Sequence, residues 1–206
     1  ALARGLSIKG NNPTNFYEVL DGTWLAIDRK LMLSGTKASA DALYIDCIKQ
    51  GVTTIFDHHA SYGEIPGSLF EIAKSAKEFG IRSCLCYEVS DRDGEEKCLQ
   101  AIKENADFIT YCEEQKDPML AAMFGGHALF TISDKTFERN YKNAKKAGVK
   151  TFVYISVIKA DSAPGVPMLH AKYLFEEELK KSGLNYVIHR PTGYFYDIAK
   201  VFMPMI

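Results

Sequence analysis

Three histidines and an aspartate have side chains that could do chemistry in the first part of this chain. Asp57, His58 and His59 are consecutive and end an apolar run, and His127 stands at the end of a later run. Imidazole and carboxylate groups bind zinc, which activates water for hydrolysis at neutral pH. Successive strand residues point to opposite faces, so His58 and His59 would not face one metal together. One of them could join Asp57 and His127, but ordinary loop imidazoles explain the same residues, and we assign no catalytic residue and no metal site.

The cysteines give a second candidate metal site and an expectation about location. They are Cys47, Cys84, Cys86, Cys98 and Cys112. A CxC pair such as Cys84 and Cys86 can bind metal, but no second CxxC or histidine pair stands at ligand spacing. Because the count is odd and two cysteines share one expected strand, we predict reduced, buried thiols in a cytoplasmic protein.

Composition narrows the class of protein. The chain has 206 residues, of which 47% are hydrophobic and 25% charged, with a net charge of −1. This balance is typical of a globular domain that needs no stapling by disulfides or metal. The charges are mixed along the chain, and no apolar run approaches the roughly 20 residues that span a bilayer. We therefore expect neither a nucleic acid nor a membrane as partner.

The elements that must position these residues repeat along the chain. Five short apolar runs, rich in β-branched and aromatic residues, predict strands, and helical patterns lie between them. The runs lie at residues 52–56, 82–88, 120–124, 151–156 and 186–189. Their starts are about 30 to 38 residues apart, the length of a βα unit. The sequence predicts a single α/β domain with five parallel strands in sequential order, with helices and an N-terminal helical arm covering the sheet; the alternative is a doubly wound sheet.

Capping residues, glycines and apolar stripes predict where the helices begin and end. Ser68 and Glu71 form the pattern of a capping box, and Gly80 ends the helix that follows. Phe137 and Tyr141 begin an apolar stripe that continues through residue 147, which predicts an unbroken helix over 134–147. Further helices are predicted over 16–27, 39–50 and 170–182.

A sheet in sequential order leaves one face open. Right-handed crossovers place every βα helix on the same face, and five strands are too few to close an eight-stranded barrel. Either the apolar helix over 16–27 or a second copy of the chain must cover the other face. We expect a homodimer through this uncovered sheet face.

Residues 1–136 resemble a segment of an amidohydrolase barrel of the aminohydrolase or chlorohydrolase branch. The segments that carry the resemblance are 1–6 (ALARGL), 51–61 (GVTTIFDHHAS), 82–94 and 126–134 (GHALFTISD). The resemblance implies a metal held by an HxH pair on the first strand and by His and Asp residues of later strands. This chain begins just after the HxH position and departs from the pattern before the later ligands. No ligand can therefore be carried over.

Residues from about 140 to 206 resemble the C-terminal half of an NmrA-like, atypical short-chain dehydrogenase. The segments are 143–156 (NAKKAGVKTFVYIS), 170–172 with Glu176, 179–186 and 189–191 (HRP). The resemblance implies that Ser156, Lys172 and Pro191 lie beside a nicotinamide cofactor. Met168 stands where the family has its acidic tyrosine, and no GxGxxG turn for the pyrophosphate occurs. A solvated Lys172 paired with Glu176 is the structural alternative.

Taken together, the two resemblances predict a chimera, half TIM barrel and half Rossmann, recombined or engineered. We expect one domain over 1–206, formed by a barrel-like segment 1–136 and a Rossmann-like segment 137–206 joined within a helix. Both halves lack the residues of their family's site, so we expect no native catalysis and no cofactor. The alternatives are a weak NAD(P)- or phosphate-binding module and a residual metal-dependent amidohydrolase.

Overall fold

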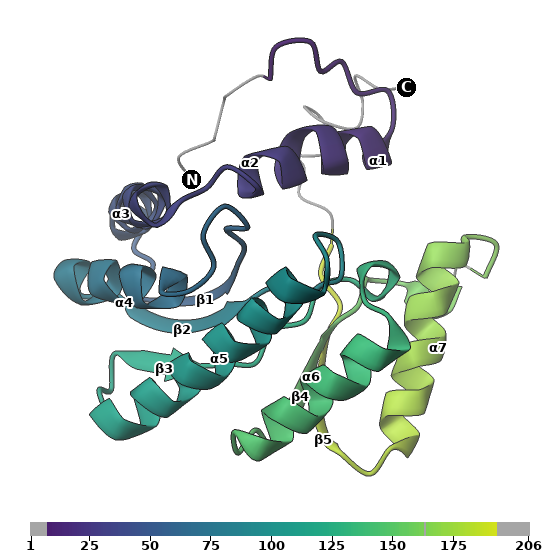
Figure 1. Cartoon of the computed structure of the whole chain (residues 1–206). Coiled ribbons are helices and arrows are strands. Elements are labelled where there is room, and N and C mark those ends of the chain that lie inside the picture. Colours follow the sequence, from purple (N-terminus) through teal and green to yellow (C-terminus); the bar gives the residue numbers. More distant parts are fainter. Residues whose placement is uncertain (1–7, 163, 193–206) are drawn as a thin grey trace. The chain divides into compact units, whose positions relative to one another are not determined.

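The structure, a computed structural model, describes residues 8–162 and 164–192 (Figure 1). It is an α/β protein whose five described strands are all parallel to their neighbours, as the sequence predicts. The chain divides into two compact units, one up to Val149 (unit 1) and one from Lys150 (unit 2). No helix of the described part is long and apolar enough to cross a membrane.

The sheet of unit 1 has three strands. These are β1 (Thr54–His59), β2 (Arg82–Tyr87) and β3 (Leu120–Ala122), in the sequential order β1-β2-β3. Phe56 lies opposite Cys84, and Leu85 lies opposite Ala122. Because the strands are parallel and in register, their carboxyl ends meet at one edge, where the loops that follow them gather.

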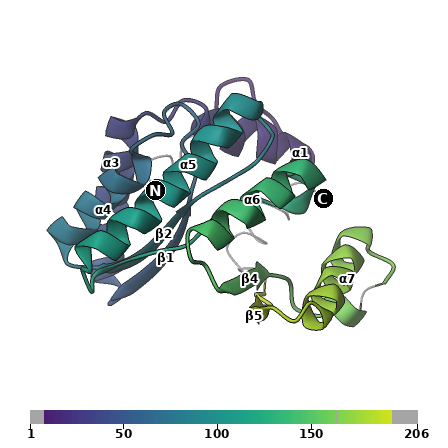
Figure 2. The same ribbon diagram turned by 60° about the horizontal axis from the view of Figure 1, so that its bottom comes forward.

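Helices cover one face of this sheet (Figure 2). Both α4 (Ser68–Phe79) and α5 (Glu95–Gln115) pack on β2, and α3 (Leu33–Lys49) packs on α4. A further helix, α6 (Asp134–Lys146), contacts α5. The core lies between the helices and the sheet and includes Leu69, Leu85 and Phe108, each fully buried. The other face stays open, with Phe56 73% exposed.

The start of α4 differs from the capping-box prediction. Ser68 is buried, and its hydroxyl makes no hydrogen bond. The carboxylate of Glu104, on α5, instead accepts hydrogen bonds from the backbone amides of Gly67 (2.8 Å) and Leu69 (2.9 Å). A carboxylate from another helix therefore satisfies the free amides of the first turn, which a local pattern search does not see. The predicted end of α4 is confirmed, since Gly80 adopts a positive φ of 67°.

The N-terminal arm is helical, as predicted, but its middle is a π-helix. Its parts are α1 (Phe16–Val19), a π-helix (Leu20–Leu25) and α2 (Ala26–Asp28). Asp28 is 3.1 Å from Arg92, and Arg29 is 2.9 Å from Asp93, two residues of the loop after β2. The described part of the arm therefore lies against the carboxyl edge of the sheet and not over the face that carries Phe56.

The apolar stripe of α6 is only partly buried. Phe137 is 37% exposed and Tyr141 is 43% exposed. Polar contacts hold the helix instead: Thr136 donates to Asp91 (2.6 Å), and Asn140 donates to the carbonyl of Gly125 (3.0 Å). The helix is unbroken from residue 134 to 146, as its periodicity predicts.

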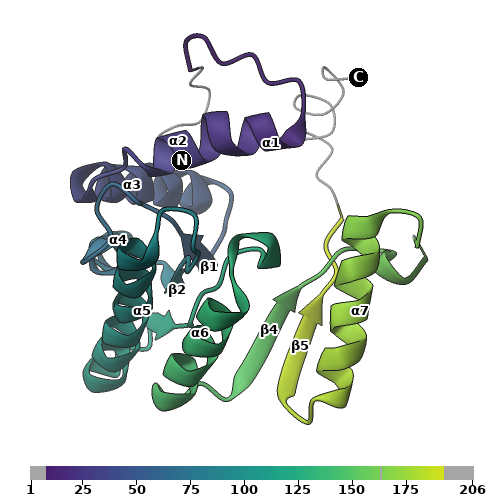
Figure 3. The same cartoon turned by 45° about the vertical axis from the view of Figure 1, so that its right-hand side comes forward.

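The described part of unit 2 has a two-stranded sheet and one long helix (Figure 3). The strands β4 (Thr151–Ile155) and β5 (Asn185–His189) are parallel, and α7 (Pro167–Lys181) connects them. Phe175 of α7 packs on Tyr154, with ring centroids 4.5 Å apart. Val153 and Val187, paired on the opposite face, are 48% and 43% exposed. All five predicted strands are present and sequential within each sheet, but they form two sheets where we expected one.

Candidate functional site

A buried ionic cluster lies just beyond the carboxyl end of β2. Glu88 follows the strand directly and is 5% exposed. Nη2 of Arg92 is 3.1 Å from Oε1 of Glu88 and 3.1 Å from Oδ2 of Asp28. The guanidinium carbon lies 4.0 Å from the centre of the Tyr62 ring, a cation–π contact. Loops after β1 and β2 and the N-terminal arm thus meet around one arginine.

Asn105 of α5 fixes the strand end that carries this cluster. Its side chain accepts from the amide of Tyr87 (2.9 Å) and donates to the carbonyl of the same residue (2.9 Å). It also accepts from the amide of Gly125, after β3 (3.2 Å). A Cβ atom on Gly125 would lie 2.2 Å from the Tyr87 carbonyl oxygen, so only glycine permits this approach. The end of β2 and the following loops are therefore held rigidly.

His127 joins the cluster from the loop after β3. Its Nε2 is 3.6 Å from Oε2 of Glu88, and its Nδ1 is 2.7 Å from the hydroxyl of Thr131. The amide of His127 donates to the carbonyl of Val89 (2.9 Å), which aligns the two loops. The imidazole is therefore oriented from both sides.

Burial shifts the pKa values of Glu88 and His127 in this cluster. It raises the pKa of Glu88 to about 7, because desolvation outweighs the attraction of Arg92. The contact with Arg92 is short, but Oε1 of Glu88 makes no hydrogen bond of standard geometry, which weakens the opposing effect. Burial, then the charge of Arg92, lowers the pKa of His127 to about 4. Glu88 could therefore exchange a proton near neutral pH, while His127 is neutral there.

The structure separates the histidines that the sequence singled out. Asp57 and His59 line a cavity on the helix-covered side of β1. His58 points to the opposite face, where its Nδ1 is 3.6 Å from Sγ of Cys86. His127 lies with Glu88. Within residues 8–162 and 164–192, no three His, Cys, Asp or Glu side chains are grouped to hold a metal, so these residues do not fit the zinc site that the amidohydrolase resemblance implies.

The three residues expected to bind a cofactor lie near the carboxyl ends of β4 and β5 in unit 2. They are Ser156, Lys172 and Pro191. The amide of Ser156 donates to the carbonyl of His189 (2.7 Å), and the amide of Ile158 donates to that of Pro191 (3.0 Å). Nζ of Lys172 donates to the carbonyl of Ile155 (2.9 Å). The three residues therefore lie close together, but the ammonium group of Lys172 binds the protein backbone.

Glu176 does not pair with Lys172, contrary to the structural alternative stated above. Its carboxylate is fully buried and bound by Arg190, whose Nε lies 3.0 and 3.1 Å from its two oxygens and whose Nη2 makes a further contact. Arg190 holds the pKa of Glu176 below its usual value. The buried Ser156 hydroxyl also faces Glu176 and adds to this lowering, yet it makes no hydrogen bond of standard geometry. Lys172 instead lies 5.4 Å from the Tyr154 ring centre.

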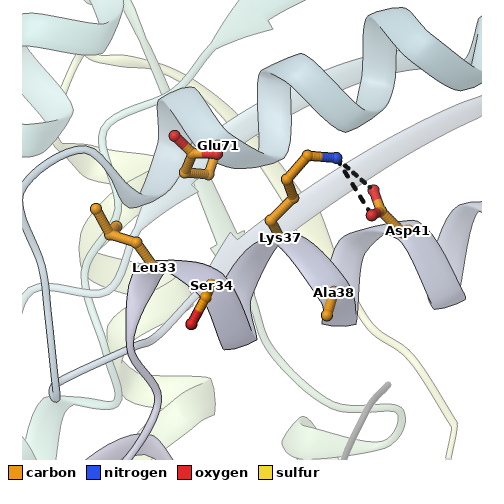
Figure 4. Close-up of a pocket in the computed structure, with 6 residues that line it drawn as sticks. All are labelled: Leu33, Ser34, Lys37, Ala38, Asp41 and Glu71. Carbon is orange, nitrogen blue, oxygen red and sulfur yellow. Dashed lines mark hydrogen bonds and ion pairs between the residues drawn. The ribbon is translucent and has the colours of Figure 1, made fainter.

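An open hollow of about 380 Å³ runs between α3 and α4 (Figure 4). The charged side chains of Lys37 and Asp41 in this hollow have partners nearby. Lys37 is 3.2 Å from Asp41 and 3.0 Å from Glu78, and Asp41 also accepts a hydrogen bond from Ser75 (2.5 Å). The charged side chains of Lys37 and Asp41 in this hollow are therefore already paired within the protein.

No motif or spacing in the sequence pointed to Glu88, Arg92 or Glu104 as a site residue. A signal for the first two was nevertheless present, because an acidic residue directly after a buried strand and an arginine four positions later are unusual at an apolar edge. Glu104 gave no such signal, since it lies in the middle of a helix rich in charged residues.

Comparison with known proteins finds two separate kinds of relative. A 5-methylthioadenosine/S-adenosylhomocysteine deaminase of Thermococcus sibiricus is 29% identical over 115 residues, covering 56% of this chain and 26% of the relative. A 5'-deoxyadenosine deaminase of Methanobrevibacter smithii is 34% identical over 94 residues, covering 46% of this chain and 20% of the relative. The photosystem II assembly factor Ycf39 of Cyanophora paradoxa is 36% identical over 55 residues, covering 27% of this chain and 17% of the relative. No family model matches the chain.

These matches agree with the two resemblances drawn from the sequence. Deaminases of the amidohydrolase family cover about half of the chain, and an NmrA-like relative separately covers about a quarter. The chain spans about a quarter or less of the length of each of these curated relatives. The similarities therefore describe segments and support a two-part composition.

Proposed function

We propose that this chain is a chimera of an amidohydrolase-like and an NmrA-like segment, with a structural role and no catalytic activity of its own. One observation supports the absence of activity: within each unit, the ionic groups at the strand ends pair with one another. Arg92 pairs with Glu88 and Asp28, and Arg190 pairs with Glu176. The carboxylates of Asp28, Glu88 and Glu176 are therefore each balanced by an arginine of the same unit, although Nε and Nη1 of Arg92 make no hydrogen bond.

Two assays test this proposal. The protein is loaded with one equivalent of zinc, and ammonia release is measured with 5'-deoxyadenosine, methylthioadenosine and S-adenosylhomocysteine, which the names of the relatives suggest as substrates. We expect the zinc-loaded protein to release ammonia no faster than the zinc-loaded Glu88→Gln variant. Turnover that depends on zinc and is lost with Glu88→Gln contradicts the proposal and favours the residual amidohydrolase.

A weak NAD(P)- or phosphate-binding module is the second candidate. The assembly of Ser156, Lys172 and Pro191 at one strand edge favours it. Against it stands the Lys172 ammonium, which donates to the Ile155 carbonyl and so offers less to a phosphate. Titration with NADPH, followed by its fluorescence, decides: saturable binding that Lys172→Met abolishes supports this candidate, and a linear response supports the chimera without a ligand.

A homodimer through the open sheet face remains part of the proposal. Phe56, at 73% exposure, lies at the centre of β1 on that face, next to Cys84 of β2. Burial of such a side chain contributes roughly 1.5–3 kcal/mol, so a second copy is favoured to cover it. Light scattering should give twice the mass of one chain, and Phe56→Lys should give a monomer; a monomeric wild-type protein contradicts the dimer.

The domain boundaries and the location of the protein are also proposals. We propose that 1–136 and 137–206 are the two ancestral segments of one domain over 1–206, although the compact units divide after Val149. We propose a cytoplasmic location, which is supported by five cysteines that are all free thiols.

A further inference from the structure

A second cavity in unit 1 lies between α3, β1 and α4. Its volume is about 110 Å³, enough for several waters or one small molecule. Thr36 and Tyr44 line it from α3, and Asp57 and His59 line it from β1. It is separate from the ionic cluster at Glu88.

Two polar atoms at this cavity have no partner. The Oγ1 atom of Thr36 makes no hydrogen bond although the residue is only 1% exposed, and the buried Nε2 atom of His59 makes none either. A buried polar group without a partner costs about 1–3 kcal/mol. Two such groups around one cavity indicate that a polar molecule completes the site.

The charge of the cavity limits what this molecule can be. Among the described residues of the lining, Asp57 is the one acidic residue, and none is a lysine or an arginine. Burial raises the pKa of Asp57, and a cation beside the carboxylate would stabilise its ionised form. Burial lowers the pKa of His59 to about 3, so its imidazole is neutral at pH 7 and can accept a hydrogen bond. A lining with one carboxyl group and further hydrogen-bond acceptors suits a donor-rich cation better than an anion.

We propose that this cavity binds a small primary ammonium ion. The three N–H donors of an ammonium group match three acceptors of the lining: the Asp57 carboxylate, Oγ1 of Thr36 and Nε2 of His59. The alkyl part lies against Ile55 and Ile72, which form the aliphatic wall. The volume limits the ligand to roughly two to five non-hydrogen atoms. This inference is independent of the function proposed above, because none of these residues belongs to the ionic clusters.

Titration with methylammonium chloride tests the proposal. Chemical shifts of the Ile55 and Ile72 methyl groups are followed by NMR in the full chain, with tetramethylammonium chloride and urea as parallel probes. We expect saturable shifts with methylammonium, none with tetramethylammonium, which has no N–H donor, and at least tenfold weaker binding of urea, which has no charge.

Matched variants identify the acceptors. Asp57→Asn and Thr36→Val should each weaken methylammonium binding at least tenfold, whereas Asp107→Asn, an exposed carboxylate on α5, should leave it unchanged. Thr36→Val removes an unsatisfied hydroxyl and keeps the shape of the side chain, so it tests the proposal even if Asp57→Asn does not fold. Equal responses to methylammonium and tetramethylammonium, urea binding as tight as methylammonium, or unchanged binding in Thr36→Val would each overturn it, leaving a cavity that holds water alone.

Discussion

The carboxylate of Glu104, in the middle of α5, accepts a hydrogen bond from the backbone amide of Leu69, 2.9 Å away at the start of α4. Its other oxygen accepts from the amide of Gly67 at 2.8 Å. Glu104 is 3% exposed, so a buried charge of one helix is balanced by the free amides and the positive end of another. The contact links the two helices that pack on β2.

Glu104→Ala should lower the free energy of unfolding by about 2–3 kcal/mol, because it leaves two buried amides without an acceptor. Glu104→Gln should cost less, about 1–2 kcal/mol, because its amide oxygen can still accept one hydrogen bond. Urea unfolding followed by circular dichroism measures both. Asp107→Asn is the matched control one turn further along α5, and a loss in Glu104→Ala no larger than in this control would show that the cap contributes nothing.

Glu88 should make the stability depend on pH. Its pKa is raised to about 7 in the folded state, so between pH 4.5 and 7 the folded chain keeps a proton that the unfolded chain loses. Its contribution to stability is therefore present below about pH 4.5 and is lost as pH rises towards 7. The loss amounts to about 2–3 kcal/mol.

The pH profile of Glu88→Gln isolates this effect, because His127, whose lowered pKa acts with the opposite sign between pH 6.5 and 4, is present in both proteins. The free energy of unfolding of the variant minus that of the wild type should rise by about 2–3 kcal/mol from pH 4.5 to 7. Glu96→Gln is the exposed control on α5. A constant difference across this range would mean that Glu88 is ionised throughout and that its pairing with Arg92 outweighs burial.

The pair of Glu176 and Arg190 should stabilise unit 2. Arg190→Met should lower the free energy of unfolding of unit 2, since it leaves the buried Glu176 carboxylate without its arginine partner. Adding Glu176→Met should restore part of the loss, because two apolar side chains replace the pair. The double variant is compared with both single variants by urea unfolding, and strictly additive losses would show that the two side chains do not interact.

Urea unfolding tests the proposal that residues 1–206 form one domain. The large core of buried residues lies entirely between residues 40 and 120, whereas Ala160 and Leu179 are the buried apolar residues of the described part of unit 2. If unit 2 depends on unit 1 for its stability, as one domain requires, circular dichroism and the fluorescence of Trp24, the single tryptophan, should follow one transition. Loss of circular dichroism at lower urea concentration than the change in Trp24 fluorescence would overturn the proposal, because the two units would then unfold separately.

The sequence by itself determined the elements and the α/β class. Short apolar runs and glycine stops are local signals, so all five strands and four of the five helices whose bounds were predicted lie within about three residues of those bounds. The exception is α3, which begins at Leu33 where we predicted residue 39. Alternation along β1 also separated His58 from His59, as the structure confirms.

Only the tertiary structure decided how distant residues meet. The capping of α4 by Glu104, the placement of Arg92 between Glu88 and Asp28, and the pairing of Glu176 with Arg190 instead of Lys172 join residues that are 14 to 64 positions apart, except for the short step from Glu88 to Arg92. Local patterns cannot specify such contacts, because they depend on which loops and helices the packing brings together. The division into two sheets also could not be predicted locally. The sequence of a strand indicates how deeply the strand is buried, but it does not specify which strand pairs with it.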